Sequence, residues 1–273
     1  GLGDVYKRQG PGGGSKLVAR NAEAAIKVET GMKGVKIMNL MVSGGTEARN
    51  IGIHFVGATD NGMLSNIIGI NLHTGVKIEQ AKNMQIVNCW VCELPNSIEL
   101  IGGENIVVKN CQLGAQPTGI TCKVQEVNKL SFINNQVYPD GRENLVLDAC
   151  NNCVIEGNNF KSYYNGILVL NGNDNTVNKN IFWLTGAVQN QLLDHGDDFG
   201  IINVKGNNNM VASNSLSCEW AYAGAVTVNA VQGTGNVFKN CFVDNLESYR
   251  VFLVNAQTEV SNCVSSDKVS IVE

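Results

Sequence analysis

Residues 83–113 read NMQIVNCWVCELPNSIELIGGENIVVKNCQL and contain the repeating unit of the chain. The strand-like piece QIVNCWV is followed by a turn, a second piece SIEL, another turn, and then VVKNCQL, in which the first pattern returns. Cys89 and Cys111 occupy the same small slot in the two copies, 111 − 89 = 22 residues apart. Self-similarity at a period of this size indicates a solenoid.

The same register can be followed in two ladders along the whole chain. The slot of the first ladder is predicted at Leu40, Asn66, Cys89, Cys111, Asn135, Asn158, Asn180, Asn214, Asn240 and Cys263. The second ladder, usually Gly followed by apolar–x–apolar, is predicted at Gly52, Gly75, Ser97, Gly119, Asn144, Gly166, Gly200, Gly224 and Arg250. Both ladders share one long step, from 180 to 214 and from 166 to 200.

Short β-branched segments bounded by Gly, Asn and Asp are typical of strands, and no segment keeps a helical period. We therefore predict an all-β fold, a right-handed parallel β-helix of about nine or ten coils with the single-stranded, pectate-lyase-like architecture.

The first nine residues, GLGDVYKRQ, fit no part of the repeat. They resemble the translation of an adaptor used in sequencing libraries, so we expect the natural N-terminus to lie further upstream. Residues 1–16 are predicted to lie outside the fold, and residues 17–273 to form one β-helix domain that is truncated at its N-terminal end. The compartment, secreted or cytoplasmic, stays open.

The composition narrows the classes of partner. Only 16% of the 273 residues are charged, and the net charge is −4 with a pI near 5.5, which disfavours nucleic acid. No apolar run is long enough to span a bilayer. Asparagine is common, as in KGNNN and NGNDN. In a solenoid, stacked asparagines hydrogen-bond along the axis and tolerate the left-handed backbone of tight corners, so we interpret most of them as scaffold.

The nine cysteines do not suggest a disulfide framework. Cys89, Cys111 and Cys263 fall in the inward slot and Cys241 beside it, where a free thiol packs as a small apolar group. Cys150 and Cys153 form a CxxC without a second pair or a histidine at ligand spacing. We predict no metal site and no cofactor, and unpaired thiols favour a reducing compartment.

The middle residue of each apolar–x–apolar triplet is expected to point outward, because side chains alternate along a strand. This column begins with His54, Lys77, Glu99 and Thr121. It is predicted to continue with an apolar half, Val146, Leu168, Ile202, Val226 and Phe252. An exposed apolar column of this height is too large for a monomer, so we predict a homo-oligomer packed through it.

The long step contains an insertion, WLTGAVQNQLLDHGDDFG, which brings together Asp194, His195, Asp197 and Asp198. A long loop on a rigid solenoid is a common place for function. The loop is either a solvated acidic turn or a site that binds sugar hydroxyls or supplies a catalytic carboxylate. Calcium is a weaker alternative because the spacing matches no known loop.

Glu99 differs from the scattered surface acids because it is expected to stand outward on a strand, next to Lys77. Glu93 lies on the turn that leads to it. A glutamate held on a rigid sheet suits acid–base chemistry. The alternative is a plain Glu–Lys cross-strand pair.

A series of short segments resembles glycoside hydrolase family 91, the inulin fructotransferases and difructose dianhydride hydrolases. These segments are NSIEL, NCQLGAQPTGIT, VYPDGREN, DACNNCVIEGNNF, SYYNGILVLNG and HGDDFGIINVKGNNN. The resemblance runs from about residue 25 to about residue 255 and lacks the N-terminal part of the family. It implies a trimer of β-helices with active sites between subunits, and a fructan as substrate that is cyclised or hydrolysed without a cofactor.

The resemblance also implies site residues. The family pairs an aspartate on the NCWV-type strand with a glutamate on the SIEL-type strand, and these positions match Asn88 and Glu99. Asn88 departs from the family, because an amide cannot act as a general acid or base. Either Glu93, or Asp197 and Asp198 of a neighbouring subunit, would then take that role, or this chain has lost or changed the activity of the family. Arg142, Asp197, Asp198, His195 and Lys77 are the candidate sugar contacts.

Three functions stay open. The first is an enzyme acting on fructans or difructose dianhydrides, the second a pectate-lyase-like enzyme, and the third a non-catalytic binding or structural β-helix. Converging carboxylates at Glu99 would favour the first, and an aromatic stripe without such acids would favour the third. The fold alone cannot separate them.

Overall fold

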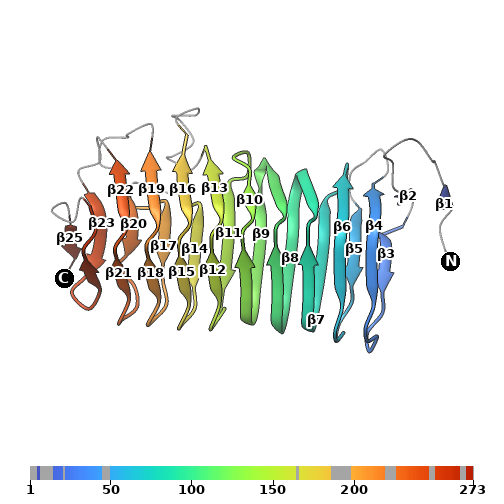
Figure 1. Cartoon of the computed structure of the whole chain (residues 1–273), viewed down its shortest axis with the longest axis horizontal. Coiled ribbons are helices and arrows are strands. Elements are labelled where there is room, and N and C mark those ends of the chain that lie inside the picture. Colours follow the sequence, from blue (N-terminus) through green and yellow to red (C-terminus); the bar gives the residue numbers. More distant parts are fainter. Residues whose placement is uncertain are drawn as a thin grey trace.

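The protein is an elongated parallel β-helix, as the repeat predicts (Figure 1). The computed structural model describes residues 5–6, 15–20, 22–44, 50–163, 166–185, 198–218, 226–245, 250–264 and 269–272. Every regular element in these ranges is a strand. The described residues therefore include no helix that could cross a bilayer. The fold prediction is confirmed.

Each coil has three faces, which we number in chain order. Face 1 contains β3 (Ala24–Val28), β5 (Ile51–Phe55), β11 (Glu143–Asp148), β14 (Leu168–Asn171), β17 (Ile202–Val204), β20 (Val226–Ala230), β23 (Arg250–Asn255) and β25 (Val269–Val272). Face 2 contains β12 (Val154–Glu156), β15 (Thr176–Asn178), β18 (Met210–Ala212), β21 (Val237–Lys239) and β24 (Glu259–Ser261). Face 3 contains β2 (Ser15–Val18), β10 (Gln136–Val137), β13 (Asn159–Ser162), β16 (Ile181–Leu184), β19 (Ser215–Cys218) and β22 (Phe242–Asn245).

Some strands run round the corners between faces. β4 (Lys36–Ser43) and β6 (Met63–Ile70) cover faces 2 and 3, and β7 (Thr74–Val87) covers faces 1 and 2. β8 (Trp90–Lys109) and β9 (Gln112–Ile133) pass through faces 3, 1 and 2 in turn. Apart from β1 (Val5–Tyr6), which pairs antiparallel with β2, all pairings are parallel between the described strands.

Buried asparagines hold successive coils together at the corner between faces 2 and 3. The side-chain oxygen of Asn158 accepts from the backbone N–H of Asn135 at 2.8 Å and from its side-chain amide at 3.0 Å. Asn180 and Asn214 repeat the pattern on the next coils. The predicted scaffold role of the slot asparagines is therefore confirmed.

The slot column differs from the prediction at two coils. Ile67 and Cys241 occupy it, whereas Asn66 and Asn240 lie one residue earlier. Both asparagines have positive φ, 54° and 53°, and belong to a second column at the corner itself. Asparagine is suited to either place, because its amide bonds along the stack and its backbone tolerates the left-handed conformation.

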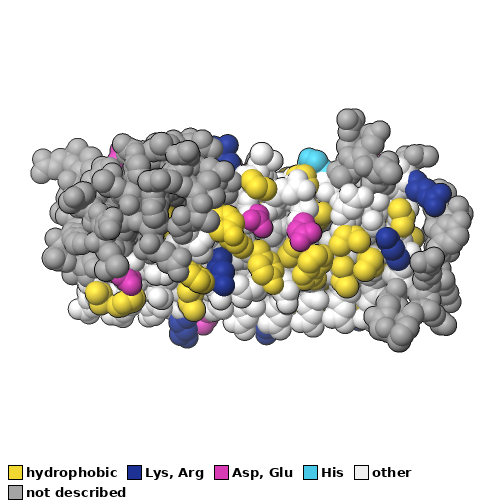
Figure 2. Space-filling view, turned by 90° about the horizontal axis from the view of Figure 1, so that it is seen from above, with side chains coloured by type: hydrophobic (Ala, Val, Ile, Leu, Met, Phe, Trp, Pro, Cys, Tyr) yellow, Lys and Arg dark blue, Asp and Glu magenta, His cyan; other side chains and the backbone are white. Residues whose placement is uncertain are grey.

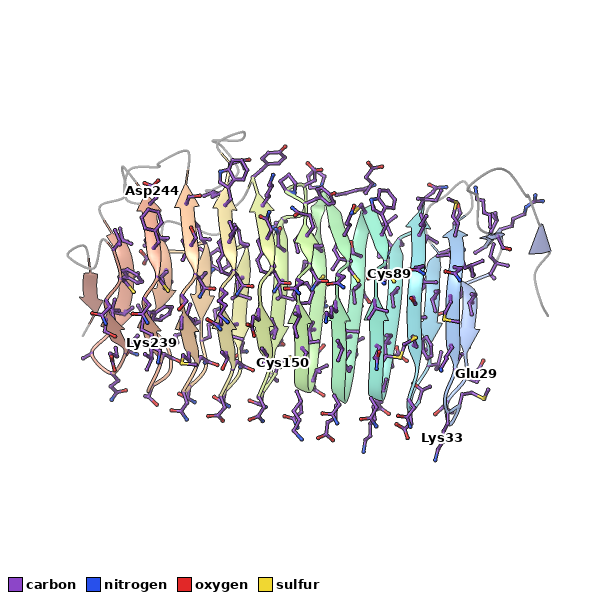
Figure 3. The ribbon with its side chains drawn as sticks, viewed as in Figure 1. Glu29, Lys33, Cys89, Cys150, Lys239 and Asp244 are labelled. Atoms are coloured by element: carbon purple, nitrogen blue, oxygen red, sulfur yellow. The ribbon has the colours of Figure 1, made fainter. Side chains whose placement is uncertain are left out.

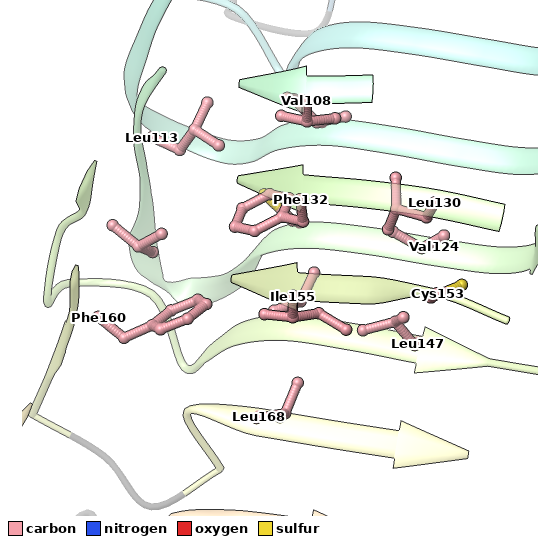
Figure 4. Packing of buried hydrophobic residues seen from close by; sticks show 14 of the residues in the cluster. Val108, Leu113, Val124, Leu130, Phe132, Leu147, Cys153, Ile155, Phe160 and Leu168 are labelled. Atoms are coloured by element: carbon pink, nitrogen blue, oxygen red, sulfur yellow. The ribbon is translucent and has the colours of Figure 1, made fainter. Parts of the chain in front are cut away.

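The interior is filled by aliphatic and aromatic side chains stacked along the axis (Figure 4). Phe132, Phe160 and Phe182 follow one another through the core, and the rings of Phe160 and Phe182 are stacked with centroids 5.0 Å apart. Eight cysteines are free and buried among the described side chains, as predicted (Figure 3). Their burial makes them part of the packing.

The predicted apolar half of the outward column is wrong in four of its five residues. Leu168, Ile202, Val226 and Phe252 are all buried in the interior, and only Val146 faces outward. The true column on face 1 is Lys27, His54, Lys77, Glu99, Lys123, Val146, Val169, Asn203, Asn229 and Leu253. The face thus offers no five-coil apolar column for subunit packing.

Two local features cause the errors in the predicted outward column, one at Thr121 and the other from Leu168 onward. Val91 pairs with Leu113 but Asn96 pairs with Ile120, so the corner of β9 contains two more residues than that of β8. Lys123, and not Thr121, therefore stands beside Glu99. Further along, the run ILVL at residues 167–170 is apolar on both faces of the strand and cannot fix the alternation by itself.

Candidate active site

Glu99 stands on the outer surface of face 1, as predicted, and is half-buried. The buried hydroxyl of Thr74, on the preceding coil, donates to Glu99 Oε1 at 3.3 Å. Nδ1 of His73 lies 3.1 Å from the same hydroxyl oxygen. Because Thr74 gives its only proton to Glu99, His73 Nδ1 must be the donor in the second bond. The imidazole, hydroxyl and carboxylate form one hydrogen-bonded chain.

A second carboxylate lies on the same surface. Lys77 pairs with Glu99 across the ladder but turns its ammonium to Glu79 on its own strand, at 2.9 Å. This hydrogen bond holds the pKa of Glu79 below its ordinary value, with help from the nearby His54, whose Nε2 lies 3.5 Å from Glu79 Oε1. Glu79 is therefore an ionised carboxylate at neutral pH.

The two glutamates are close enough to act on one substrate. Strand spacing and rise put the Cα atoms of Glu79 and Glu99 roughly 8 Å apart. Glu99 takes part in none of the ion pairs found between described side chains. The alternative interpretation of Glu99 as half of a Glu–Lys pair is therefore wrong.

Asn88 is not part of this cluster. It lies at the corner between faces 2 and 3, is exposed, and has a φ of 55° in the same column as Asn66 and Asn110. Its N–H donates to the carbonyl of Lys109. A single chain does not bring Asn88 to Glu99, because face 3 lies between them in the coil. The left-handed backbone at this corner, which asparagine tolerates, explains why position 88 is an asparagine.

Glu93 lies at the corner between faces 3 and 1, exposed and with a φ of 63°. Gln116 donates to its backbone carbonyl at 3.1 Å. Glu93 is thus near the edge of face 1 on the same coil as Glu99, and no hydrogen bond or ion pair joins the two among the described residues.

Arg142 and Glu143 lie at the same corner, at the start of β11. Arg142 Nε is 3.8 Å from Glu143 Oε1, and the carboxylate is largely buried. Burial raises the pKa of Glu143, and the neighbouring Arg142 offsets part of this effect. A carboxylic acid with a raised pKa is a candidate proton donor. Strand geometry puts its Cα roughly 14 Å from that of Glu99.

The insertion is only partly described. Asp194, His195 and Asp197 lie outside the described residues, whereas Asp198 is exposed at its end. Asn229 donates to the carbonyl of Asp198, and Asn203 exchanges two hydrogen bonds with Gly200. Both asparagines belong to the outward column of face 1. The insertion therefore returns to the body of the protein on the same face as Glu99.

Four residues of this cluster are not among the predicted site residues: His73, Thr74, Glu79, and His54, which the sequence places only in the outward column. Thr74 and His73 could have been found from the sequence. The 22-residue step between Lys77 and Glu99 places their segment, NLHTGVKIEQ, on the strand next to that of Glu99. Nothing in the sequence marks Glu143 as buried.

Comparison with known proteins gives the class of the chain. A family model described as "Periplasmic copper-binding protein (NosD)" matches residues 18–184, and one described as "Right handed beta helix region" matches residues 118–271. Each match covers more than half of the 273 residues. The chain therefore belongs to the right-handed β-helix families that these two models describe.

Solved structures with the same fold include an enzyme named DFA-IIIase. DFA-IIIase from Arthrobacter chlorophenolicus A6 without its lid superposes with a TM-score of 0.76 at 21% identity, covering 92% of this chain and 69% of that one. The same enzyme in complex with GF2 gives 0.75 at 20% identity, covering 93% and 72%. PfbA, a surface adhesin of Streptococcus pneumoniae, gives 0.58 at 11%, covering 86% and 70%. No curated protein sequence matches.

These similarities establish the fold, which is shared by an enzyme and an adhesin. The copper named in one family description can be tested against the residues. Among the described side chains, no three of His, Cys, Asp and Glu come together as a metal would require. The described residues thus do not fit such a centre, and the face 1 cluster is the candidate site that we consider further.

Proposed function

We propose that the protein is a carbohydrate-active β-helix enzyme that acts on a fructan or on a difructose dianhydride. The observation that carries the proposal is Glu99, a carboxylate without an ion-pair partner that a buried threonine holds on a rigid sheet. The ionised Glu79 stands beside it. The similarity to family 91 segments and the fold shared with DFA-IIIase support a fructan as the substrate.

The arrangement supplies the two groups that glycosidic bond cleavage needs. Glu99, in its acid form, protonates the oxygen of the leaving group, and the resulting carboxylate, held by Thr74, then accepts the proton of the attacking hydroxyl. Glu79 supplies negative charge next to the oxocarbenium-like centre. The attacking group is then a fructosyl hydroxyl, which closes a ring, or water, which hydrolyses the product.

A non-catalytic binding function is the second candidate. Asn88 favours it, because the acid that family 91 has at this position is an amide here. Hydrophobic side chains gathered over the middle coils also suit a binding surface (Figure 2). A trimer with sites between subunits stays a proposal as well, to be tested by sedimentation.

The test is a chromatogram of products after incubation with inulin and, separately, with a difructose dianhydride. The parent should convert at least one of them, and Glu99→Gln should lower the rate by about 10²–10⁴. Glu104→Gln removes an outlying surface carboxylate in the same way and should leave the rate unchanged.

Two outcomes would contradict this proposal. Full activity in Glu99→Gln would remove Glu99 from the mechanism. A folded but silent parent that becomes active as Asn88→Asp would mean that the chain has lost its catalytic acid and now binds without turnover.

A further inference from the structure

Face 3 carries a surface that the proposed reaction does not use. Its outward column includes Trp90, Gln112, Gln136 and Asn159 on four successive coils. Two more ring side chains, Tyr138 and Trp183, stand in the neighbouring outward column. Face 3 is a different side of the coil from face 1, on which Glu99 stands. Figure 3 shows ring side chains projecting along the upper edge of the middle coils.

The rings are held and partly open to solvent. Lys161 Nζ lies 4.6 Å from the centroid of the Trp183 ring, so a cation–π contact fixes this side chain on the sheet. The Tyr138 hydroxyl donates to Gln112 Oε1 at 3.1 Å. Trp90, Tyr138 and Trp183 are all half-buried. Aromatic side chains with one apolar side and one polar end are suited to recognition surfaces.

The amides between the rings determine which ligand fits. Gln112 is exposed and Gln136 and Asn159 are half-buried, one above the other. An amide both donates and accepts, as does a sugar hydroxyl. On these coils the two columns contain no carboxylate, and their one cation, Lys161, faces a ring. A surface of rings and uncharged amides complements a neutral saccharide better than a nucleic acid or an acidic polysaccharide.

We propose that the middle of face 3 binds a chain of neutral sugars that extends over successive coils. The rings stack on apolar sugar faces and the amides bond to hydroxyls. This binding goes beyond the proposed function, because it requires no bond cleavage and lies on another face. A long polysaccharide held there would raise the local concentration of substrate for any site on the same body.

The experiment is native affinity electrophoresis in gels containing soluble inulin or a soluble neutral β-glucan. It uses the Glu99→Gln background, so that turnover cannot consume the probe. The parent background should be retarded by at least one probe. Trp90→Ala and Trp183→Ala should each weaken retardation roughly tenfold. Gln112→Ala changes an exposed side chain, so it tests the same surface if a tryptophan variant fails to fold.

Met38→Ala is the matched control, because Met38 is an apolar side chain on face 2 that is 51% exposed. Its retardation should equal that of the background. Unchanged retardation in the tryptophan and Gln112 variants would overturn the proposal. So would sedimentation data in which these variants only dissociate an oligomer, since face 3 would then contact a second copy. Retardation without any turnover by the unmutated protein would keep this proposal and reject the enzymatic one.

Discussion

At the scale of single residues, Glu99 differs from three other glutamates on the body of the solenoid, which are paired with lysine. Glu79, Glu104 and Glu156 each lie within 3.2 Å of a lysine, at 2.9, 2.9 and 3.2 Å. Glu99 is held by Thr74, a buried hydroxyl that positions the carboxylate without neutralising it. A carboxylate that is held by a neutral hydroxyl, and not by a cation, can still exchange a proton with a substrate.

Thr74 should therefore be a positioning residue. Thr74→Val removes the donor but keeps the shape, and we expect kcat on the active fructan substrate to fall roughly tenfold with little change in KM. Thr74→Ser keeps the hydroxyl and should restore most of the rate. Equal kinetics for the valine and serine variants would show that the hydroxyl does not act on Glu99.

The pH dependence of stability should separate Glu79 from Glu143. The lowered pKa of Glu79 means that its contribution is present above pH 4.5 and is lost as the pH falls through its folded pKa. Glu79→Gln should therefore have a lower thermal midpoint than the parent at pH 7, and the difference should shrink in acid. Thermal midpoints between pH 3 and pH 8 would test this.

Glu143 should behave with the opposite sign. Its raised pKa means that the folded state favours the neutral acid, so its contribution is lost as the pH rises from 4.5 through the folded pKa. Glu143→Gln should melt above the parent at pH 7 and equal it near pH 4. A variant that melts below the parent at pH 7 would mean that the ionised form is stabilised by its surroundings.

The sequence allows Glu99 and Lys77 to be located, because the 22-residue step is regular there. Thr74 is missed because the residue opposite Glu99 in the ladder is Lys77, and Thr74 lies three residues before Lys77. Glu143 is missed because burial at a corner depends on neighbouring coils. Asn88 is assigned by resemblance to the catalytic centre, but the corner geometry places it elsewhere.

At the scale of elements, the stacked asparagines at the corner between faces 2 and 3 are a main source of cohesion between coils. Asn158 donates to the Phe132 carbonyl and to Asn180, and accepts from two groups of Asn135. Its removal leaves buried partners unsatisfied, which costs more than the bonds themselves contribute.

Asn158→Ala should therefore lower the thermal midpoint by roughly 5–10 °C. Asn178 lies on face 2, points outward and is half-buried, so Asn178→Ala is the control and should shift the midpoint by about 2 °C or less. Calorimetry on the two variants tests the ladder. Equal shifts would show that the inner stack is not special.

The glycines at the corner between faces 1 and 2 set how closely coils approach. A Cβ added at Gly206 would lie 1.7 Å from the carbonyl oxygen of Gly172, whereas one added at Gly69, which is on face 3, would lie 3.4 Å from a Val91 methyl group. Gly206→Ala should prevent folding or lower the midpoint by roughly 10 °C or more, and Gly69→Ala by a few degrees at most. Similar midpoints would contradict this close approach.

At the scale of the whole molecule, the solenoid is the part that sequence reasoning predicts best. A step of 22 to 27 residues repeats through the chain apart from one step of 34, and each coil needs only its neighbours to bury its core. The register is lost where the β9 corner gains two residues and where residues 167–170 are apolar on both faces. At these two places, only the pairing between neighbouring coils determines which side chains face outward.

The central claim is that substrate is processed on face 1 at Glu99. The most direct measurement is a crystal structure of Glu99→Gln soaked with a difructose dianhydride, because the inactive variant would retain its ligand. We expect sugar density within hydrogen-bond distance of residue 99, beside Thr74 and Glu79. Density confined to face 3, with face 1 empty at saturating ligand, would contradict processing at Glu99. The protein would then bind sugar without acting on it there.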